Sequence, residues 1–226
     1  MRFARSVHLP TGVRIPGVAA GRQHDSGYPV RAEMRPLAKE LARRTLGFPA
    51  TGRLLLITGG SQGAAPLNRW VEARLDDLAA RGIHALCLTG PGGRDERLER
   101  TGSVVHFLPF CHQMAAAYSA ADLAVTRAGA GTLAELATCR TPAILVPLPH
   151  AADDHQTANA LQAAAGGAAI LLPEAELNRL AVVVFDRLHD NAALSVMRDA
   201  LALADAANRW DALAAETVAL AGGTVA

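Results

Sequence analysis

Short apolar runs alternate along this chain with longer segments in which apolar residues recur at helical spacing. The apolar runs predict strands at 53–58, 83–89, 103–108, 121–126, 142–146 and 168–172. The segments between them predict helices at 65–81, 112–119, 132–139 and 155–165. The first of these helices has one apolar face, which is made by Leu67, Trp70, Val71, Leu75 and Leu78. This alternation predicts an α/β fold with a doubly wound, Rossmann-like parallel sheet.

The two ends of the chain depart from the alternation. Residues 1–26 carry Gly, Pro and Arg without clear periodicity, which predicts a poorly ordered lead-in. A helix is expected at 31–44, with Pro36 near its first turn. About the last 50 residues predict two or three Ala/Leu-rich helices that pack on the edge of the sheet. Because no long linker interrupts the remainder, we expect one domain at 27–226.

Two glycine-rich turns each follow a predicted strand and open a predicted helix. The first is Gly-Gly-Ser-Gln-Gly-Ala at 59–64, and the second is Arg-Ala-Gly-Ala-Gly-Thr at 127–132. Glycine lets a phosphate approach the backbone, and the N–H groups at a helix start favour negative charge. The loop at 147–156 reaches the same edge, because ligands of open parallel sheets bind beyond the carboxyl ends of the strands. The pattern therefore predicts a phosphate-bearing ligand at this edge.

Several residues near these turns have two interpretations. Ser61 could donate a hydrogen bond to a phosphate or cap the following helix. Glu135 could bind a ribose diol, or it could form a capping box with Thr132, which the spacing alone slightly favours. Gln156 and Asn159 could present amides to sugar hydroxyls or cap the helix at 155–165.

Neither metal chemistry nor nucleic-acid binding is expected. His150 and His155 could ligate zinc, but no third ligand is suggested, and the adjacent Asp153 and Asp154 do not form a D-x-D motif. The 22 basic and 21 acidic residues give a net charge of +1 without a basic tract, so the charge gives no indication of a general nucleic-acid binder. Three cysteines without metal-ligand spacing indicate reduced thiols in the cytosol: Cys87, Cys111 and Cys139.

A dehydrogenase is the nearest rival interpretation of the first turn. The segment 58–65 nearly matches the T-G-x-x-x-G-x-G turn of short-chain dehydrogenases, which require a Tyr and a Lys four residues later. Tyr28 and Tyr118 are the only tyrosines, and Lys39, the only lysine, stands four residues after neither. Hydride transfer by that mechanism is therefore excluded.

With these motifs assembled, the chain resembles the carboxyl-terminal half of the MurG-like glycosyltransferases of family 28. The resemblance runs from Gly27 to about Leu180. It is carried by 27–31, 59–64, 67–68, 110, 114–118, 121–123, 127–130, 132–136, 146–150, 154–156 and 159–160. That family has a GT-B fold of two Rossmann-like domains, of which the carboxyl-terminal one binds UDP-N-acetylglucosamine. The resemblance thus implies the donor-binding half of a hexosyltransferase.

The resemblance also implies roles for individual residues. Arg31 and the backbone at Cys111 would border the uracil, and Glu135 would take the ribose hydroxyls. Ser61 and its neighbours would hold the diphosphate, and no residue is implied as general base. The complete implied set is Arg31, Gly60, Ser61, Gln62, Gly63, Cys111, Ala130, Gly131, Thr132, Glu135, His155 and Gln156.

Three departures from the family pattern limit what the resemblance implies. Tyr28 replaces the commoner Asn of a hinge segment, and His155 stands where some relatives carry a second amide. Only 26 residues precede Gly27, too few for an acceptor-binding domain. We therefore expect a cytoplasmic, metal-independent, inverting UDP-GlcNAc transferase of peptidoglycan synthesis. A separate subunit would bring the lipid-linked acceptor at the inner face of the membrane. The alternative is an inactive or regulatory UDP-sugar-binding module.

Overall fold

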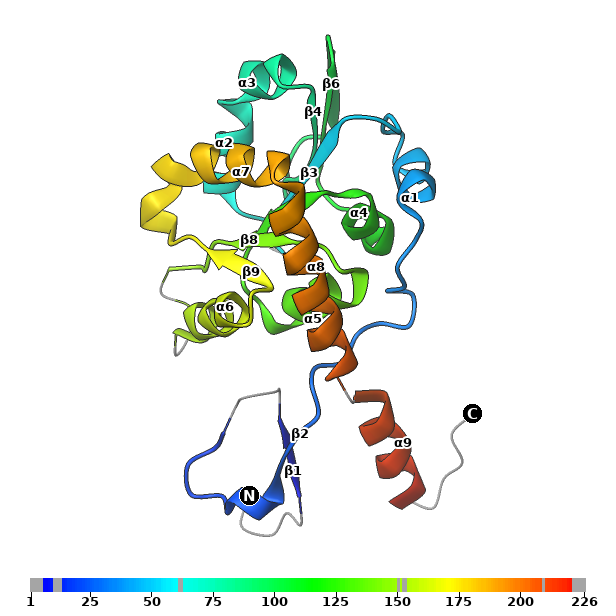
Figure 1. The fold of residues 1–226 in the computed structure, drawn as a ribbon, viewed down its shortest axis with the longest axis vertical. Helices are drawn as coiled ribbons and strands as arrows, with labels where there is room; N and C mark the ends of the chain where they lie inside the picture. The colour runs from blue at the N-terminus through cyan, green and yellow to red at the C-terminus, as the bar shows by residue number, and fades with distance from the viewer. Residues whose placement is uncertain are drawn as a thin grey trace.

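The computed structural model describes residues 6–9, 14–60, 63–149, 151, 154–208 and 210–220. Within them, a seven-stranded sheet has the order β5-β6-β4-β3-β7-β8-β9 (Figure 1). Neighbouring strands are parallel except β5, which runs antiparallel to β6. The strands are β3 (Arg53–Thr58), β4 (Ile83–Leu88), β5 (Glu96–Arg100), β6 (Ser103–Leu108), β7 (Leu123–Thr126), β8 (Ala143–Leu145) and β9 (Ala169–Leu171).

The order of the parallel strands indicates where a ligand crevice is expected. Numbered by appearance along the chain, the parallel strands lie in the order 3-2-1-4-5-6, which is the Rossmann order. The predicted doubly wound sheet is confirmed. Of its six predicted strands, β3 and β6 have the predicted ends and the other four are one or two residues shorter at one end or both. The strand β5 was not predicted, because four of its five residues are charged and it lies at the edge of the sheet. The order reverses between β3 and β7, where a ligand crevice is expected.

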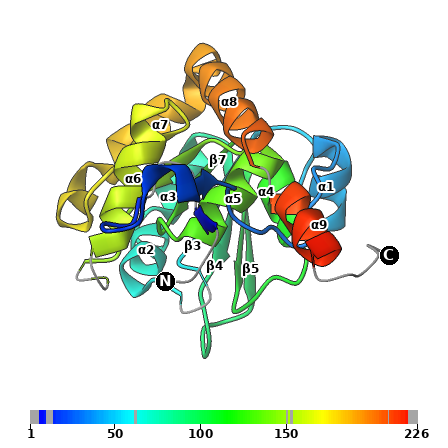
Figure 2. The same ribbon diagram turned by 90° about the horizontal axis from the view of Figure 1, so that it is seen from below.

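Helices cover both faces of the sheet (Figure 2). Alternate strand residues feed two buried clusters: Leu54 and Leu56 face α1, α4 and α5, whereas Leu55 and Ile57 face α2, α3 and α7. The helices are α1 (Lys39–Thr45), α2 (Ala65–Glu72), α3 (Leu75–Ala80), α4 (Met114–Ala120), α5 (Ala130–Cys139), α6 (His155–Ala165), α7 (Leu180–His189), α8 (Asn191–Ala206) and α9 (Trp210–Leu220), with short 3-10 helices at Ala20–Arg22 and Glu174–Arg179.

Three helix predictions need correction. The segment 65–81 forms two helices, because Arg74 leaves helical geometry at φ −121° and ψ 13°. The helix expected at 31–44 begins only at Lys39, since Ala38 is extended with ψ 135°. The helix α7 does not pack on the sheet edge. Its Leu180, Val184 and Leu188 are fully buried in the cluster on the α2–α3 face.

A second, two-stranded parallel sheet lies within residues 1–26, where no strands were predicted. It pairs β1 (Val7–Leu9) with β2 (Gln23–Asp25), and it lies with α9 at one end of the molecule (Figure 1). The segment 27–31, which follows this sheet, is attached to the α8–α9 junction, because Asn208 Nδ2 donates to the Tyr28 carbonyl at 2.9 Å. Gly27 has φ +77°, and a Cβ there would lie 2.2 Å from Asn208 Oδ1. Another residue would be strained at this φ and would displace the Asn208 amide, so the position favours glycine.

A buried ionic network attaches α1 to the end of the sheet at which the parallel strands begin, opposite the glycine-rich turns. Asp122 has no exposed surface, and its carboxylate accepts hydrogen bonds from Lys39, from Arg43 NH2 at 2.9 Å and from the Leu54 N–H at 2.8 Å. Arg53 NH1 lies 3.2 Å from the same carboxylate. Burial alone would raise the pKa of Asp122, but the hydrogen bonds and the positive charges of Lys39 and Arg43 outweigh burial and lower it.

Candidate functional site

The two glycine-rich turns meet at the predicted crevice. The first leaves β3 and the second leaves β7, and these strands pair in parallel from Leu55↔Leu123 to Thr58↔Thr126. Their carboxyl ends therefore lie side by side. This confirms that both turns reach the same edge of the sheet, at the point where the strand order reverses.

Close backbone contacts shape the first turn. A Cβ at Gly59 would lie 2.1 Å from the Gly63 carbonyl carbon, and one at Gly63 would lie 2.5 Å from the Thr89 carbonyl oxygen. The Gly60 N–H donates to Thr58 Oγ1 at 3.2 Å, while a Cβ at Gly60 would meet open space. Gly59 and Gly63 are therefore required by the protein's own packing. Ser61 and Gln62 lie outside the described residues.

We expect Gly63→Ala to lower the free energy of unfolding by about 2 kcal/mol, which combines the left-handed φ of +72° with a backbone clash. Gly92→Ala is the matched control, because Gly92 has φ +73° and open space around its Cβ position. That control should cost only the conformational part, about 1 kcal/mol. Urea unfolding of both variants measures the difference, and equal losses would show that the contact with Thr89 is unimportant.

The second turn presents the start of α5. Gly129 is the N-cap, and the first intrahelical bond runs from the Leu133 N–H to the Gly129 carbonyl at 3.0 Å. The N–H groups of Ala130, Gly131 and Thr132 consequently have no acceptor within the helix. They point out of the first turn of α5, where the helix dipole favours an anion.

The amides of Gln156 and Asn159 position this turn. Gln156 Oε1 accepts from the Ala128 N–H at 3.3 Å and from the Leu148 N–H at 3.0 Å, and Asn159 Nδ2 donates to the Ala128 carbonyl at 2.9 Å. The capping interpretation of both residues is wrong, because α6 begins after Asp154 without a side-chain cap. The two amides instead connect the loops that follow β7 and β8.

Glu135 lies in the second turn of α5 with both carboxylate oxygens engaged. Arg31 NH2 lies 3.3 Å from Oε1, and the Tyr118 hydroxyl donates to Oε2 at 3.2 Å. The capping-box interpretation is wrong, because α5 begins two residues before Thr132 and has no side-chain cap. The side chain of Glu135 remains 20% exposed and that of Arg31 56% exposed, so this carboxylate is accessible from solvent.

Cys111 and His155, the other residues that the resemblance implies, lie outside the two turns. Cys111 lies between β6 and α4 at the same edge of the sheet, and burial raises the pKa of its thiol. His155 is the exposed first residue of α6, and His150 lies outside the described residues. Among the residues that the structure describes, no three His, Cys, Asp or Glu side chains come together as a metal site. Within the same residues, no helix is both long and apolar enough to cross a membrane.

Two residues for which the sequence pattern predicts no role connect the parts of the site. Arg127 opens the second turn, but it is buried, donates to the carbonyls of Val146 and Pro147 at 3.1 Å each, and pairs with Glu174. Tyr118 bonds Glu135 across 17 positions. No local spacing signals such partners. Two features of the sequence point to Tyr118: it belongs to the family-like segment 114–118, and it is a large aromatic residue in the Ala-rich helix α4.

Comparisons with known proteins agree with this arrangement. The profile of the glycosyltransferase family 28 C-terminal domain matches residues 54–210. A relative from Opitutus terrae is 43% identical over 213 residues, which are 92% of this chain and 56% of that protein. A relative from Synechococcus sp. (strain RCC307) is 50% identical over 174 residues, which are 76% of this chain and 47% of that protein. Both are named UDP-N-acetylglucosamine--N-acetylmuramyl-(pentapeptide) pyrophosphoryl-undecaprenol N-acetylglucosamine transferase.

Solved structures show the same architecture. MurG of Acinetobacter baumannii superposes with a TM-score of 0.58 at 30% identity, covering 82% of this chain and 53% of that one. The glycosyltransferase of kitacinnamycin gives a TM-score of 0.61 at 23% identity, which supports the fold alone. The chain spans about half the length of the curated relatives that it matches. It therefore belongs to glycosyltransferase family 28, of which it carries the C-terminal domain.

Proposed function

We propose that residues 27–226 form the donor-binding unit of a UDP-GlcNAc-dependent glycosyltransferase. The observation that carries the proposal is the accessible Glu135 carboxylate on the same helix whose first N–H groups have no intrahelical acceptor. A carboxylate suits a ribose diol, which donates two hydrogen bonds, and free backbone N–H groups suit a pyrophosphate. The transferase names of the relatives support this donor.

The reaction that fits this unit is an inverting displacement at the anomeric carbon. An acceptor hydroxyl attacks the anomeric carbon and gives its proton to a base outside the donor-binding unit, while the bond to the diphosphate oxygen breaks and UDP leaves with the electron pair. The N–H groups at the start of α5 and in the first turn would stabilise the charge that develops on the leaving group. Arg31, Cys111 and the first-turn residues at 60–63 would complete the donor site, with His155 and Gln156 on the sugar side. We assign no general base in this chain.

A separate acceptor-binding partner completes the proposal. The chain spans about half of relatives whose names include an undecaprenol-linked acceptor. We propose that an acceptor-binding unit outside residues 27–226 brings the lipid-linked acceptor, at the cytoplasmic face of the membrane. A second candidate is a UDP-sugar-binding module without transferase activity. Adding a MurG-like amino-terminal half to the chain and assaying transfer of GlcNAc separates the two candidates.

Calorimetric titration with UDP-GlcNAc and UDP-glucose, each with and without EDTA, tests the donor assignment. We expect UDP-GlcNAc to bind more tightly than UDP-glucose, in agreement with the names of the relatives. Each Kd should be the same in EDTA, because backbone N–H groups and Glu135 would make the contacts to the UDP part without a metal ion. Binding that disappears in EDTA would contradict the metal-independent site. Absence of binding by either nucleotide sugar would contradict the proposed function itself.

A further inference from the structure

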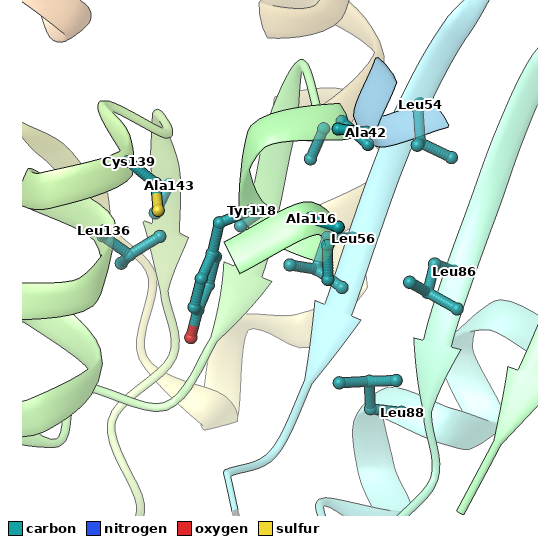
Figure 3. Close-up of a cluster of buried hydrophobic side chains, with 14 of the residues drawn as sticks. Ala42, Leu54, Leu56, Leu86, Leu88, Ala116, Tyr118, Leu136, Cys139 and Ala143 are labelled. Atoms are coloured by element: carbon teal, nitrogen blue, oxygen red, sulfur yellow. The ribbon is translucent and has the colours of Figure 1, made fainter. Parts of the chain in front are cut away.

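The phenol of Tyr118 reaches the candidate site from inside the protein. Its side chain is 2% exposed and belongs to the apolar cluster that contains Leu56, Leu136 and Ala143. Figure 3 shows its hydroxyl oxygen pointing the same way as the strand arrowheads, toward the edge that carries the glycine turns. A buried hydroxyl without a partner is unfavourable, and this one donates to Glu135 Oε2 at 3.2 Å.

The protonation state of this phenol is fixed by its surroundings. Burial, followed by the negative charge of Glu135, raises the pKa of Tyr118 far above neutral pH. The hydroxyl therefore keeps its proton and can only donate toward the carboxylate. Because the ring is held by the core, the donor stays at one position relative to α5.

The two oxygens of Glu135 consequently have different surroundings. Oε2 is held from inside the protein by Tyr118, while Oε1 lies 3.3 Å from Arg31, whose side chain is 56% exposed. A glutamate with no partner would lose rotamer freedom when a ligand bound to it. A carboxylate held beforehand avoids that cost.

We infer that Tyr118 is a positioning residue that orients the Glu135 carboxylate for the two hydroxyls of the donor ribose. The inference rests on the proposed function, since it assumes that Glu135 receives the ribose. Tyr118 acts through Glu135 and makes no contact with the nucleotide of its own.

The test compares UDP with 2′,3′-dideoxyuridine diphosphate, which lacks both ribose hydroxyls. Tyr118→Phe keeps the ring and removes the donor, and we expect it to raise the Kd for UDP by about 3- to 10-fold. The Kd for the dideoxy nucleotide should not change. A purely structural defect in the core would weaken both ligands alike.

Thr141→Val is the matched control variant. Thr141 is 1% exposed, and its hydroxyl donates to the Tyr118 carbonyl at 3.0 Å, so the variant removes a hydrogen bond to the same residue without touching the phenol. We expect it to leave the Kd for UDP unchanged. In a Glu135→Ala background, Tyr118→Phe should produce no additional loss, because its effect passes through that carboxylate.

The outcomes separate the inference from the function on which it rests. If Tyr118→Phe leaves UDP binding unchanged, or weakens both nucleotides equally, the positioning role is refuted while donor binding stands. If Tyr118→Phe weakens UDP binding further in the Glu135→Ala background, the phenol acts by another route and the inference also fails. If the unaltered chain binds no UDP, the proposed function fails and the positioning role fails with it.

Discussion

Replacing Asp122 by alanine is expected to lower the free energy of unfolding by about 3–5 kcal/mol, the cost typical of removing one partner from a buried ion pair. Arg43 is 2% exposed, so without Asp122 its guanidinium would be left as a buried charge without that counter-ion. The Leu54 N–H would also lose its acceptor. Urea unfolding at pH 7 measures the change. The loss should far exceed that of Asp77→Ala, whose carboxylate makes only exposed ion pairs with Arg74 and Arg81 at 3.6 and 3.8 Å.

The dependence of stability on pH provides a second measurement of this network. The folded-state pKa of Asp122 is lowered, so its stabilisation is complete above the unfolded pKa of about 3.9 and is lost as pH falls through the lower folded value. Below about pH 4, stability should therefore fall less steeply in Asp122→Asn than in the unaltered chain. Two results would show that the network contributes little. One is an equally steep fall in the free energy of unfolding below pH 4 in Asp122→Asn and in the unaltered chain. The other is a loss of stability in Asp122→Ala that is no larger than the loss in Asp77→Ala.

Glu135→Ala is expected to weaken UDP binding by about 1.5–3 kcal/mol, or about 10- to 150-fold in Kd, as is typical of hydrogen bonds to a charged group. The carboxylate is the acceptor that we assign to the ribose diol. Calorimetric titration with UDP measures the change. The variant should also lose some stability, because the buried Tyr118 hydroxyl would be left without its acceptor.

Two variants make this result specific. Glu135→Gln keeps an acceptor at the same place and should lose less affinity than the alanine variant. Glu33→Ala is the matched control, because the Glu33 carboxylate also lies near Arg31, at 3.8 Å, but is 70% exposed and stands outside the proposed donor site. It should bind UDP as the unaltered chain does. Unchanged affinity in Glu135→Ala would show that this carboxylate does not receive the ribose.

Much of the fold could be predicted from local pattern because the parallel strands are buried on both faces. Such strands consist of short apolar runs, and β3 is an example, with Leu54 to Ile57 at most 1% exposed. The edge strand β5 escaped prediction because solvent covers most of its charged side chains. The start of α5 at Ala130 was also not predicted, for a different reason. Its cap is a backbone conformation at Gly129, whereas the predicted cap was a Thr132-Glu135 side-chain pair.

The sequence by itself determined the alternation of the six parallel strands with helices, the position of both glycine turns at one end of these strands, and the family. Each of these depends on residues close together in the chain, where periodicity and turn chemistry act. Only the tertiary structure decided that Glu135 pairs with Arg31 across 104 positions, and that Asp122 collects cations from α1 and β3. It also showed Gln156 and Asn159 positioning the second turn. The reason is physical: side-chain partners are chosen by proximity in the folded chain, and proximity between distant residues follows from packing, which no local pattern encodes.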